Sequence, residues 1–257
     1  MDTPDIKTLV RARYGGIASA DAAGRGAPPA SCCAPTDMAR QMGYSDADLA
    51  AVPEGANLGL GCGNPQAIAA LRDGETVIDL GSGAGFDCFL AARQVGPEGH
   101  VIGIDMTHEM LAKARGNAAR IGAANVEFRL GELEHLPVAN DTADVILSNC
   151  VINLVPDKAQ VFREAFRALK RGGRLAISDV VNIAQLSEDL KADPALMCGC
   201  VSGAAPAHQI EAWLTAAGFD QIQITVKPES RALVASWAPG RGVEDCVASA
   251  SIEARKP

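Results

Sequence analysis

The chain has 257 residues, of which 48% are hydrophobic and 4% aromatic, and its formal net charge is −8. This suits one α/β domain with a small addition, and a core large enough to need no disulfides. The acidic balance argues against nucleic acid as a partner, and no apolar run approaches the ~20 residues of a membrane span. No signal-peptide apolar segment follows Met1, so we expect a cytoplasmic protein with reduced cysteines and no membrane partner.

Residues 1–45 are predicted to be a flexible N-terminal segment. Within them, residues 22–35 are small, rich in Pro and Gly, and show no hydrophobic period, which is typical of a loop. This loop carries two adjacent cysteines, Cys32 and Cys33. The segment is therefore expected to bring a thiol pair near the folded domain without being part of its core.

Two helix starts are predicted before the first strand. Ser45 is expected to cap a helix, with Asp48 at the capping-box position. In the second, Asn64 is the cap and Pro65 takes the first helical position. Cys62 then lies in the loop just before a helix N-terminus, where we expect its thiol pKa to be lowered.

Strands and helices alternate from Thr76 onward. Strands are predicted at 76–80, 100–105, 126–130, 143–148 and 174–179, and helices at 86–94, 107–121 and 161–169. Gly172 and Gly173 are expected to end the last of these helices. This alternation predicts a Rossmann-like α/β domain at residues 46–181, with a parallel sheet covered by helices on both faces.

The alternation is interrupted at residues 182–205, which contain Cys198 and Cys200. A helix and two strands are then predicted, at 207–217, 221–226 and 231–236. We expect residues 182–240 to cap the substrate and complete the sheet. The last residues, 241–257, are predicted to be a poorly ordered tail.

A glycine-rich turn follows the first buried strand in the run Asp79-Leu-Gly-Ser-Gly-Ala-Gly85. Gly81, Gly83 and Gly85 permit a tight turn and close approach of a ligand, and the following helix N-terminus suits a carboxylate. Asp105 ends the next strand, where an acidic side chain can accept hydrogen bonds from ribose hydroxyls. The turn and Asp105 together predict a nucleotide-like ligand.

The spacing G-x-G-x-G, led by an aspartate, resembles class I S-adenosylmethionine methyltransferases. Nicotinamide enzymes, the main alternative, use G-x-G-x-x-G instead. Met106 after the second strand, Glu132 after the third and Asn149 after the fourth extend the resemblance. It implies that these residues border the cofactor, and that S-adenosyl-L-methionine is the methyl donor.

Four motifs are similar to those of arsenite methyltransferases, and the similarity runs from about Cys32 to Val226. They are Asn57–Pro65, Asp79–Cys88, Ser148–Leu154 and Cys198–Ala204. By this resemblance Cys62, Cys150 and Cys200 bind trivalent arsenic. It further implies that Cys62 later forms a disulfide with a fourth cysteine, for which we prefer Cys33 over Cys32. One departure is Leu60, where some members carry an aromatic residue near the nucleotide.

The proposed chemistry suits three gathered thiols. Trivalent arsenic is a soft centre that prefers sulfur, and thiolate ligation leaves it a lone pair that can attack a sulfonium methyl group. No general base is needed, because the nucleophile carries no proton. Methylation oxidises arsenic, so a cysteine pair is expected to reduce it, and thioredoxin or a small thiol to reduce the resulting disulfide.

Two other functions remain open from the sequence. One is methylation of a small organic molecule, with incidental cysteines; the other is a metalloid scavenger without turnover. Zinc is disfavoured because paired C-x-x-C spacing is absent. Cys88 is expected to be a core residue, Cys198 a neighbour of the site and Cys246 an incidental thiol. The number of methyl groups added, the acceptance of antimonite and the oligomeric state are not predicted.

Overall fold

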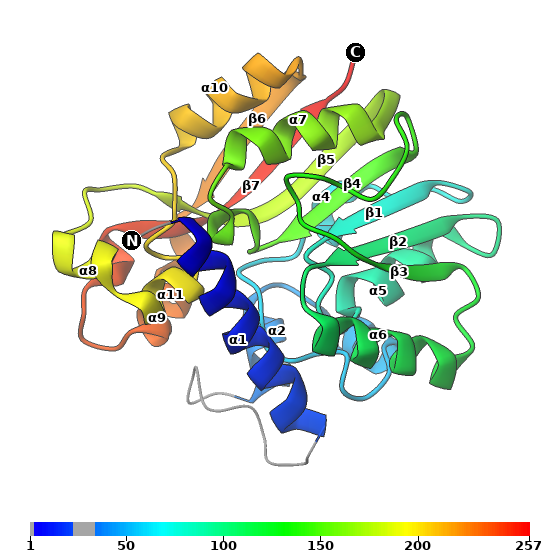
Figure 1. Ribbon diagram of the computed structural model, residues 1–257, viewed down its shortest axis with the longest axis horizontal. Helices are drawn as coiled ribbons and strands as arrows, with labels where there is room; N and C mark the ends of the chain where they lie inside the picture. The colour runs from blue at the N-terminus through cyan, green and yellow to red at the C-terminus, as the bar shows by residue number, and fades with distance from the viewer. Residues whose placement is uncertain (1–2, 23–33) are drawn as a thin grey trace.

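The computed structural model describes residues 3–22 and 34–257, with side chains described at 6–20 and 34–257. Seven strands form one sheet: β1 (Thr76–Leu80), β2 (His100–Asp105), β3 (Val126–Leu130), β4 (Ala143–Asn149), β5 (Leu169–Asn182), β6 (Asp220–Lys227) and β7 (Val247–Arg255). Their order is β3-β2-β1-β4-β5-β7-β6 (Figure 1). The first five are parallel, but β7 is antiparallel to both neighbours, so the sheet is mixed rather than wholly parallel.

Helices cover both faces of the sheet, as expected. One face packs against α4 (Gln66–Ala69), α5 (Phe86–Val95) and α6 (His108–Ile121), and the other against α7 (Lys158–Ala168) and α10 (Ala207–Ala217). The central strands are buried on both sides, which explains their continuous apolar runs. The predicted bounds of β1, β2, β3 and α10 are confirmed, and those of α5, α6, α7, β4 and β6 differ by up to three residues.

Helix α1 (Thr3–Ala22) replaces the first half of the expected flexible segment, so that prediction was wrong there. It crosses the carboxyl-end side of the sheet and contacts α6 and α9 (Pro194–Cys198) (Figure 1). Ile6, Val10, Tyr14 and Ile17 recur every three or four residues, a helical period that predicts this element. Cys32 and Cys33 lie outside the described residues.

The two helix starts are only partly as predicted. The capping box is confirmed at α3 (Asp46–Ala51), where the Ser45 and Asp48 side chains each accept from the other's backbone N–H. At α4 the N-cap position belongs to Pro65, and the helix starts one residue later than expected. The Asn64 carboxamide oxygen still accepts from the Ala67 N–H at 3.3 Å.

The glycine pair does not end a helix. Strand β5 begins directly after α7, and Gly172 and Gly173 lie in its irregular first part. The φ of Gly172 is +76°. Gly172 donates its N–H to Lys256, and Lys256 donates to Gly173. The prediction of a poorly ordered tail was also wrong, because most of it is strand β7. The small Ala and Ser side chains of β7 are buried, and the strand lies between β5 and β6.

The predicted strand at 231–236 is the helix α11 (Arg231–Trp237). Its apolar residues Leu233, Val234 and Trp237 share one helix face, and in so short a run this period is easily taken for a strand. The other short elements are α2 (Pro35–Gln41), η1 (Ile152–Leu154), α8 (Glu188–Ala192), η2 (Pro228–Ser230) and η3 (Val243–Asp245).

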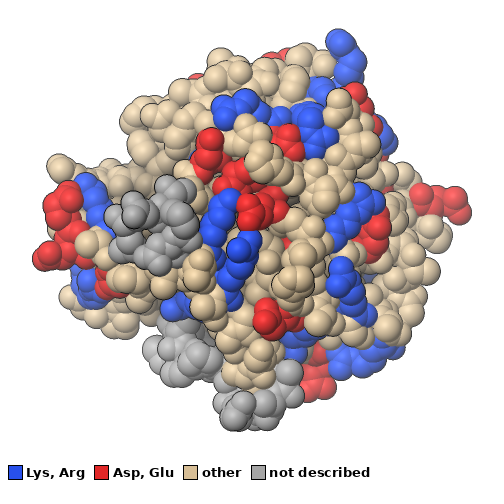
Figure 2. Space-filling view, in the orientation of Figure 1, with Lys and Arg blue, Asp and Glu red and all other residues tan. Residues whose placement is uncertain are grey.

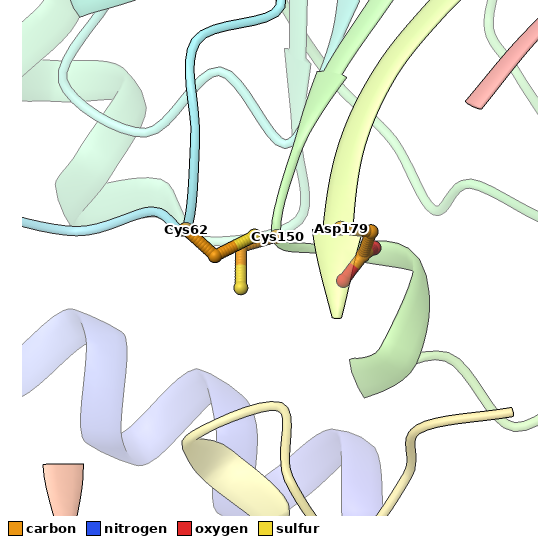
Figure 3. Close-up of side chains that lie close together, drawn as sticks. All are labelled: Cys62, Cys150 and Asp179. Carbon is orange, nitrogen blue, oxygen red and sulfur yellow. The ribbon is translucent and has the colours of Figure 1, made fainter. Parts of the chain in front are cut away.

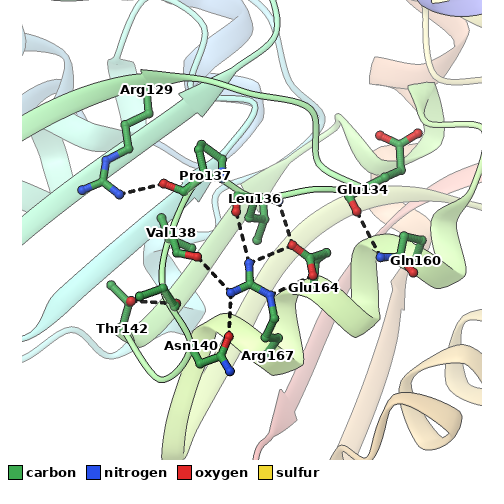
Figure 4. Close-up of polar contacts among 11 residues, drawn as sticks. Arg129, Glu134, Leu136, Pro137, Val138, Asn140, Thr142, Gln160, Glu164 and Arg167 are labelled. Carbon is green, nitrogen blue, oxygen red and sulfur yellow. Dashed lines mark hydrogen bonds and ion pairs between the residues drawn. The ribbon is translucent and has the colours of Figure 1, made fainter.

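A cluster of hydrogen bonds around Arg167 fixes the loop between β3 and β4 (Figure 4). The guanidinium donates to the carbonyls of Leu136 and Val138 at 3.1 and 2.9 Å and to the Glu164 carboxylate at 2.8 Å. Gln160 also donates to the Glu134 carbonyl at 3.1 Å. Helix α7 thus holds a loop whose first residues border the cavity at the carboxyl ends of the strands.

Acidic and basic side chains are interspersed on the face that α1 crosses (Figure 2). Within residues 3–22 and 34–257, none of the helices has the length and hydropathy to cross a membrane.

Candidate functional site: a cavity between a glycine turn and a thiol cluster

A cavity of about 500 Å³ lies at the carboxyl ends of the parallel strands. This is the edge where open α/β sheets bind ligands, at the point where strand order reverses between β1 and β4. At one end the cavity is lined by Gly81, Gly83 and Asp105, and at the other by Cys150 and Cys200. The two halves predicted separately from the sequence thus share one cavity.

The glycine turn has the backbone that its sequence predicts. Gly81, Gly83 and Gly85 have φ values of +73°, +51° and +93°, a region that favours glycine. A Cβ on Gly81 would lie 2.6 Å from the Val151 side chain. The turn therefore packs directly against the residue that follows Cys150.

Buried carboxylates surround the glycine turn. Asp105 accepts from the N–H groups of Gly83 at 3.0 Å and Thr107 at 2.8 Å, which fixes the turn to the end of β2. Asp79 accepts from the Cys88 thiol at 3.2 Å. Burial, together with the neighbouring Asp87 carboxylate, raises the pKa of Asp79 well above its ordinary range. This end of the cavity is thus prepared for a positive charge.

The lining fits S-adenosylmethionine, whose sulfonium and ammonium groups outweigh its carboxylate. Asp79, Asp87 and Asp105 line the cavity and would complement that charge. The hydroxyl of Ser82 is buried, lines the cavity and has no hydrogen-bond partner among the described residues. An unsatisfied hydroxyl of this kind calls for a polar ligand. Met106, also predicted to border the cofactor, lines the same end.

Glu132 is engaged by α1. Its carboxylate accepts from Lys7 at 2.6 Å and from Arg11 at 2.5 Å, and Lys7 also pairs with Glu134 at 2.9 Å. Hydrogen bonding to Lys7 lowers the pKa of Glu132. Its neighbour Gly131 lines the cavity instead. The partners of Glu132 among the described residues are Lys7 and Arg11, which hold α1 against this loop.

Asn149 fixes the loop that carries Cys62. Its side-chain oxygen accepts from the Cys62 N–H at 3.1 Å, and its nitrogen donates to the Gly63 carbonyl at 2.8 Å and to Tyr44 at 3.1 Å. A Cβ on Gly61 would lie 3.0 Å from the Asn149 side chain. Asn149 lines the cavity, and two of its hydrogen bonds position the loop of the first cysteine.

Cys150 and Cys200 both lie in unusual backbone turns. Their φ values are +57° and +64°, uncommon for residues other than glycine. The Cys200 thiol donates to the Cys150 carbonyl at 2.9 Å. The loops also touch closely elsewhere, because a Cβ on Gly203 would lie 2.1 Å from the Asn153 carbonyl oxygen. Two loops far apart in sequence are thereby locked with their thiols adjacent.

Asp179, near the end of β5, joins the thiols of Cys62 and Cys150. The sulfurs of Cys62 and Cys150 and a carboxylate oxygen of Asp179 all lie within 4.8 Å of one another (Figure 3). The carboxylate accepts from the N–H groups of Ile152 at 3.0 Å and Val180 at 2.7 Å, and from the Asn153 side chain at 2.9 Å. Asp179 therefore both faces the two thiols and holds the η1 turn that follows Cys150.

Burial governs the ionisation of the site. It raises the pKa of Cys62 to about 11, so the expected lowering by a helix N-terminus was wrong; the following helix has only four residues. The contact with Cys200 lowers the pKa of Cys150, but the contact with Cys62 and burial outweigh it and raise that pKa well above its usual range. The contact with Cys150 and burial raise the pKa of Cys200 well above its usual range. Burial likewise raises the pKa of Asp179 to about 6. The thiols therefore stay protonated at neutral pH, while Asp179 is mostly ionised.

Sequence reasoning missed the contribution of α1. Lys7, Val10, Arg13 and Tyr14 line the cavity, and the Tyr14 hydroxyl donates to the Cys198 carbonyl at 3.1 Å. Burial, with the nearby thiols, raises the pKa of Tyr14 well above its ordinary value. The signal that could have revealed these residues is the helical period of the first 20 residues, which the Pro/Gly-rich stretch after them obscured.

The remaining cysteines differ in position. Cys88 is buried in α5, as predicted, and its thiol also holds Asp79. Cys198 is buried beside the site and lines the cavity. Cys246 lies away from the cavity, with its sulfur 3.8 Å from the Gln185 carbonyl. Cys33, predicted as the fourth thiol, falls outside the described residues.

Comparisons with known proteins agree with this geometry. Residues 71–222 match the model of a methyltransferase domain. The chain is 49% identical over 269 residues to the arsenite methyltransferase of Halobacterium salinarum, covering 100% of this chain and 68% of that protein. It is 44% identical over 137 residues to the human arsenite methyltransferase, covering 50% of this chain and 36% of that protein.

A solved structure is similar over most of the chain. It is the arsenic(III) S-adenosylmethionine methyltransferase of Chlamydomonas reinhardtii, 28% identical, with a TM-score of 0.63 over 89% of this chain and 74% of that one. A phosphoethanolamine N-methyltransferase of Haemonchus contortus shares the fold, with a TM-score of 0.64 over 88% of this chain and 61% of that one, at 19% identity. The chain belongs to the arsenite methyltransferase family, within the class I S-adenosylmethionine-dependent methyltransferases.

Proposed function

We propose that Cys62, Cys150 and Cys200 hold trivalent arsenic as thiolates while it receives a methyl group from the other end of the cavity. The observation that carries this proposal is the single cavity lined by both the glycine turn and the thiols of Cys150 and Cys200. Cys62 reaches the site through its thiol contact with Cys150. A methyltransferase acting on an organic molecule has no use for three such thiols.

Arsenite loading needs no external base. Each thiol exchanges with one hydroxyl of arsenous acid, and the thiol proton leaves with that hydroxyl as water. Three such exchanges give a neutral arsenic centre with three sulfur ligands and a lone pair. Protonated thiols are the form that this exchange consumes, so the raised pKa values of the cysteines suit a neutral, soft substrate.

The chain's contribution to methyl transfer is positioning and exclusion of water. When bound, S-adenosylmethionine supplies an electrophilic methyl group. Asp79, Ser82 and Asp105 would hold it at the glycine turn, with Met106 and Asn149 beside them. Alignment of two bound reactants can contribute ~7 kcal/mol or more to lowering the barrier. Residues of α1, among them Val10 and Tyr14, line the cavity and would limit the access of water to the reacting atoms.

Reduction of the methylated arsenic completes the proposed cycle. A free thiolate of Cys33, or of its neighbour Cys32, attacks the sulfur of Cys62. The sulfur–arsenic bond breaks with its electron pair left on arsenic, which returns to the trivalent state on Cys150 and Cys200. The resulting disulfide needs thioredoxin or a small thiol, which suits a cytoplasmic location. In this scheme residues 46–181 bind the cofactor and residues 182–240 cap the arsenic.

The test is methylation of arsenite by the purified protein with S-adenosylmethionine and excess thiol, with products separated by chromatography. We expect methyl- and dimethylarsenicals from wild type. A protein that binds the methyl donor but leaves arsenic unmethylated would point to an organic substrate. Tight arsenite binding with no consumption of methyl donor would point to a scavenger.

A further inference from the structure

Asp179 is a buried carboxylate that the reaction described so far does not use. It is only 2% exposed, yet among the described residues no lysine or arginine forms an ion pair with it. Lys158 influences it electrostatically, but its ammonium group donates to the Val155 carbonyl at 2.9 Å. A buried charge without an ion-pair partner is costly, and such charges concentrate at functional sites.

The carboxylate is aimed at the arsenic site but is not free to act as a ligand. Three N–H donors, from Ile152, Asn153 and Val180, hold it in place. One of its oxygens still lies within 4.8 Å of the sulfurs of Cys62 and Cys150 (Figure 3). Because arsenic bonds directly to sulfur, an atom held by these two thiolates lies only a few ångströms from the carboxylate. Soft arsenic prefers the sulfurs, so Asp179 stays beside it as an oriented charge.

The proposed reaction creates a positive charge at this point. Arsenic held by three thiolates is neutral. Its lone pair becomes the arsenic–carbon bond, while the bond between the methyl carbon and the donor sulfur breaks with its electrons left on sulfur. The positive charge carried by the donor sulfur therefore passes to arsenic, where none existed before the transfer. A fixed negative group beside arsenic favours that product and the transition state leading to it.

We propose that Asp179 is a catalytic counter-ion, whose carboxylate stabilises the positive charge that arsenic acquires on methylation. This rests on the function proposed above. Oriented charges of this kind act before the reaction begins and need no rearrangement during it. Removing one such group from an enzyme costs on the order of 10²- to 10³-fold in kcat.

Asp179→Asn tests the proposal, because it removes the charge and keeps the shape. Two quantities are measured: the dissociation constant of arsenite in the absence of methyl donor, and the rate of one methylation turnover with both substrates saturating. We expect arsenite binding within ~3-fold of wild type, but a turnover rate lower by ~10²-fold. Asp220→Asn, an exposed aspartate at the start of β6, is the matched control and should equal wild type.

An unchanged turnover rate in Asp179→Asn would overturn the proposal. Loss of arsenite binding in parallel with the rate would also overturn it, because Asp179 would then only shape the loops. A wild type that binds arsenite without methylating it overturns the proposed function instead. If Asp179→Asn does not fold, Asp179→Glu keeps the negative charge at this position. We then expect a rate within ~10-fold of wild type, and a rate reduced ~10²-fold with normal arsenite binding would contradict the role of the charge.

Discussion

The methyl-donor end of the cavity is built from one short stretch of chain, whereas the thiol end is assembled from distant loops. Asp79 and Asp105 lie on the neighbouring strands β1 and β2, the glycines follow β1 directly, and the Asp105 carboxylate accepts from the Gly83 N–H. Cys62 depends on Asn149, and Cys200 on its contact with the Cys150 turn. A local motif can keep its geometry when the rest of the fold shifts, but a site made of three loops depends on each contact between them.

The largest effect that would separate the two ends comes from Cys150→Ser and Cys200→Ser. Losing a group that hydrogen-bonds to a metal ligand typically costs ~10- to 100-fold. We expect arsenite methylation to fall by more than this, because we propose that Cys150 and Cys200 are themselves ligands. Affinity for S-adenosylmethionine, measured by calorimetry, should stay near that of wild type. Cys246→Ser, outside the cavity, is the control. Full activity in Cys150→Ser would show that the thiols are incidental.

Gly81→Ala should damage both ends at once, since Gly81 is where they touch. The new methyl group meets Val151, and the φ of +73° adds strain. We expect a loss of about 2 to 4 kcal/mol in the free energy of unfolding, and weaker binding of both methyl donor and arsenite. Gly83→Ala is the control: it has a similar φ, but its nearest neighbour is the Met110 sulfur at 4.0 Å. Equal effects of Gly81→Ala and Gly83→Ala would contradict the claim that the contact with Val151 causes the loss.

Gly203→Ala should affect the thiol end alone. A methyl group there collides with the Asn153 carbonyl and pushes the Cys200 loop away from the Cys150 turn. We expect the KM for arsenite to rise ~10-fold, a displacement cost of about 1.4 kcal/mol, with methyl-donor binding unchanged. Gly116→Ala in α6, where no atom lies within 4 Å, serves as the control. An unchanged KM would mean that the loops do not depend on this contact.

Asp179→Asn, at the thiol end, should be more stable to unfolding than wild type, and the difference should grow as pH rises. The folded-state pKa of about 6 lies above the ordinary 3.8, so ionising Asp179 costs folding stability above about pH 6 and nothing below about pH 4. We expect the variant to exceed wild type by about 2 kcal/mol near pH 8, after the loss of one hydrogen bond. The gain should disappear near pH 4 in denaturant titrations. A gain that does not vary with pH would contradict this assignment.

The smallest effect is expected from Lys7→Ala, at the point where α1 is fastened across the cavity. Lys7 pairs with Glu132 and Glu134 near the surface, and such pairs contribute about 1 kcal/mol or less. We expect methyl donor to dissociate ~3-fold faster, and raised salt to reduce the difference from wild type. Arg40→Ala, which removes ion pairs away from the cavity, should have no such effect.

The same contrast explains what could be predicted from the sequence. The glycine turn and the first three strands follow from local patterns, so their residues and bounds could be read directly. The pKa of Cys62 could not, because it depends on burial under distant segments rather than on the nearby helix. Strand β7 was missed because its Ala and Ser residues give no apolar period, and it is stable only between β5 and β6. The position of Tyr14 over the thiols likewise depends on where α1 packs.

The most direct test of the central claim is the coordination of arsenic in the arsenite-loaded protein, measured by arsenic X-ray absorption in wild type and in Cys62→Ser. We predict three sulfur neighbours and no oxygen in wild type. In the variant one sulfur should be replaced by oxygen, with Cys150 and Cys200 still bound. Two or fewer sulfurs in wild type, or an identical shell in the variant, would contradict a site made by the three cysteines.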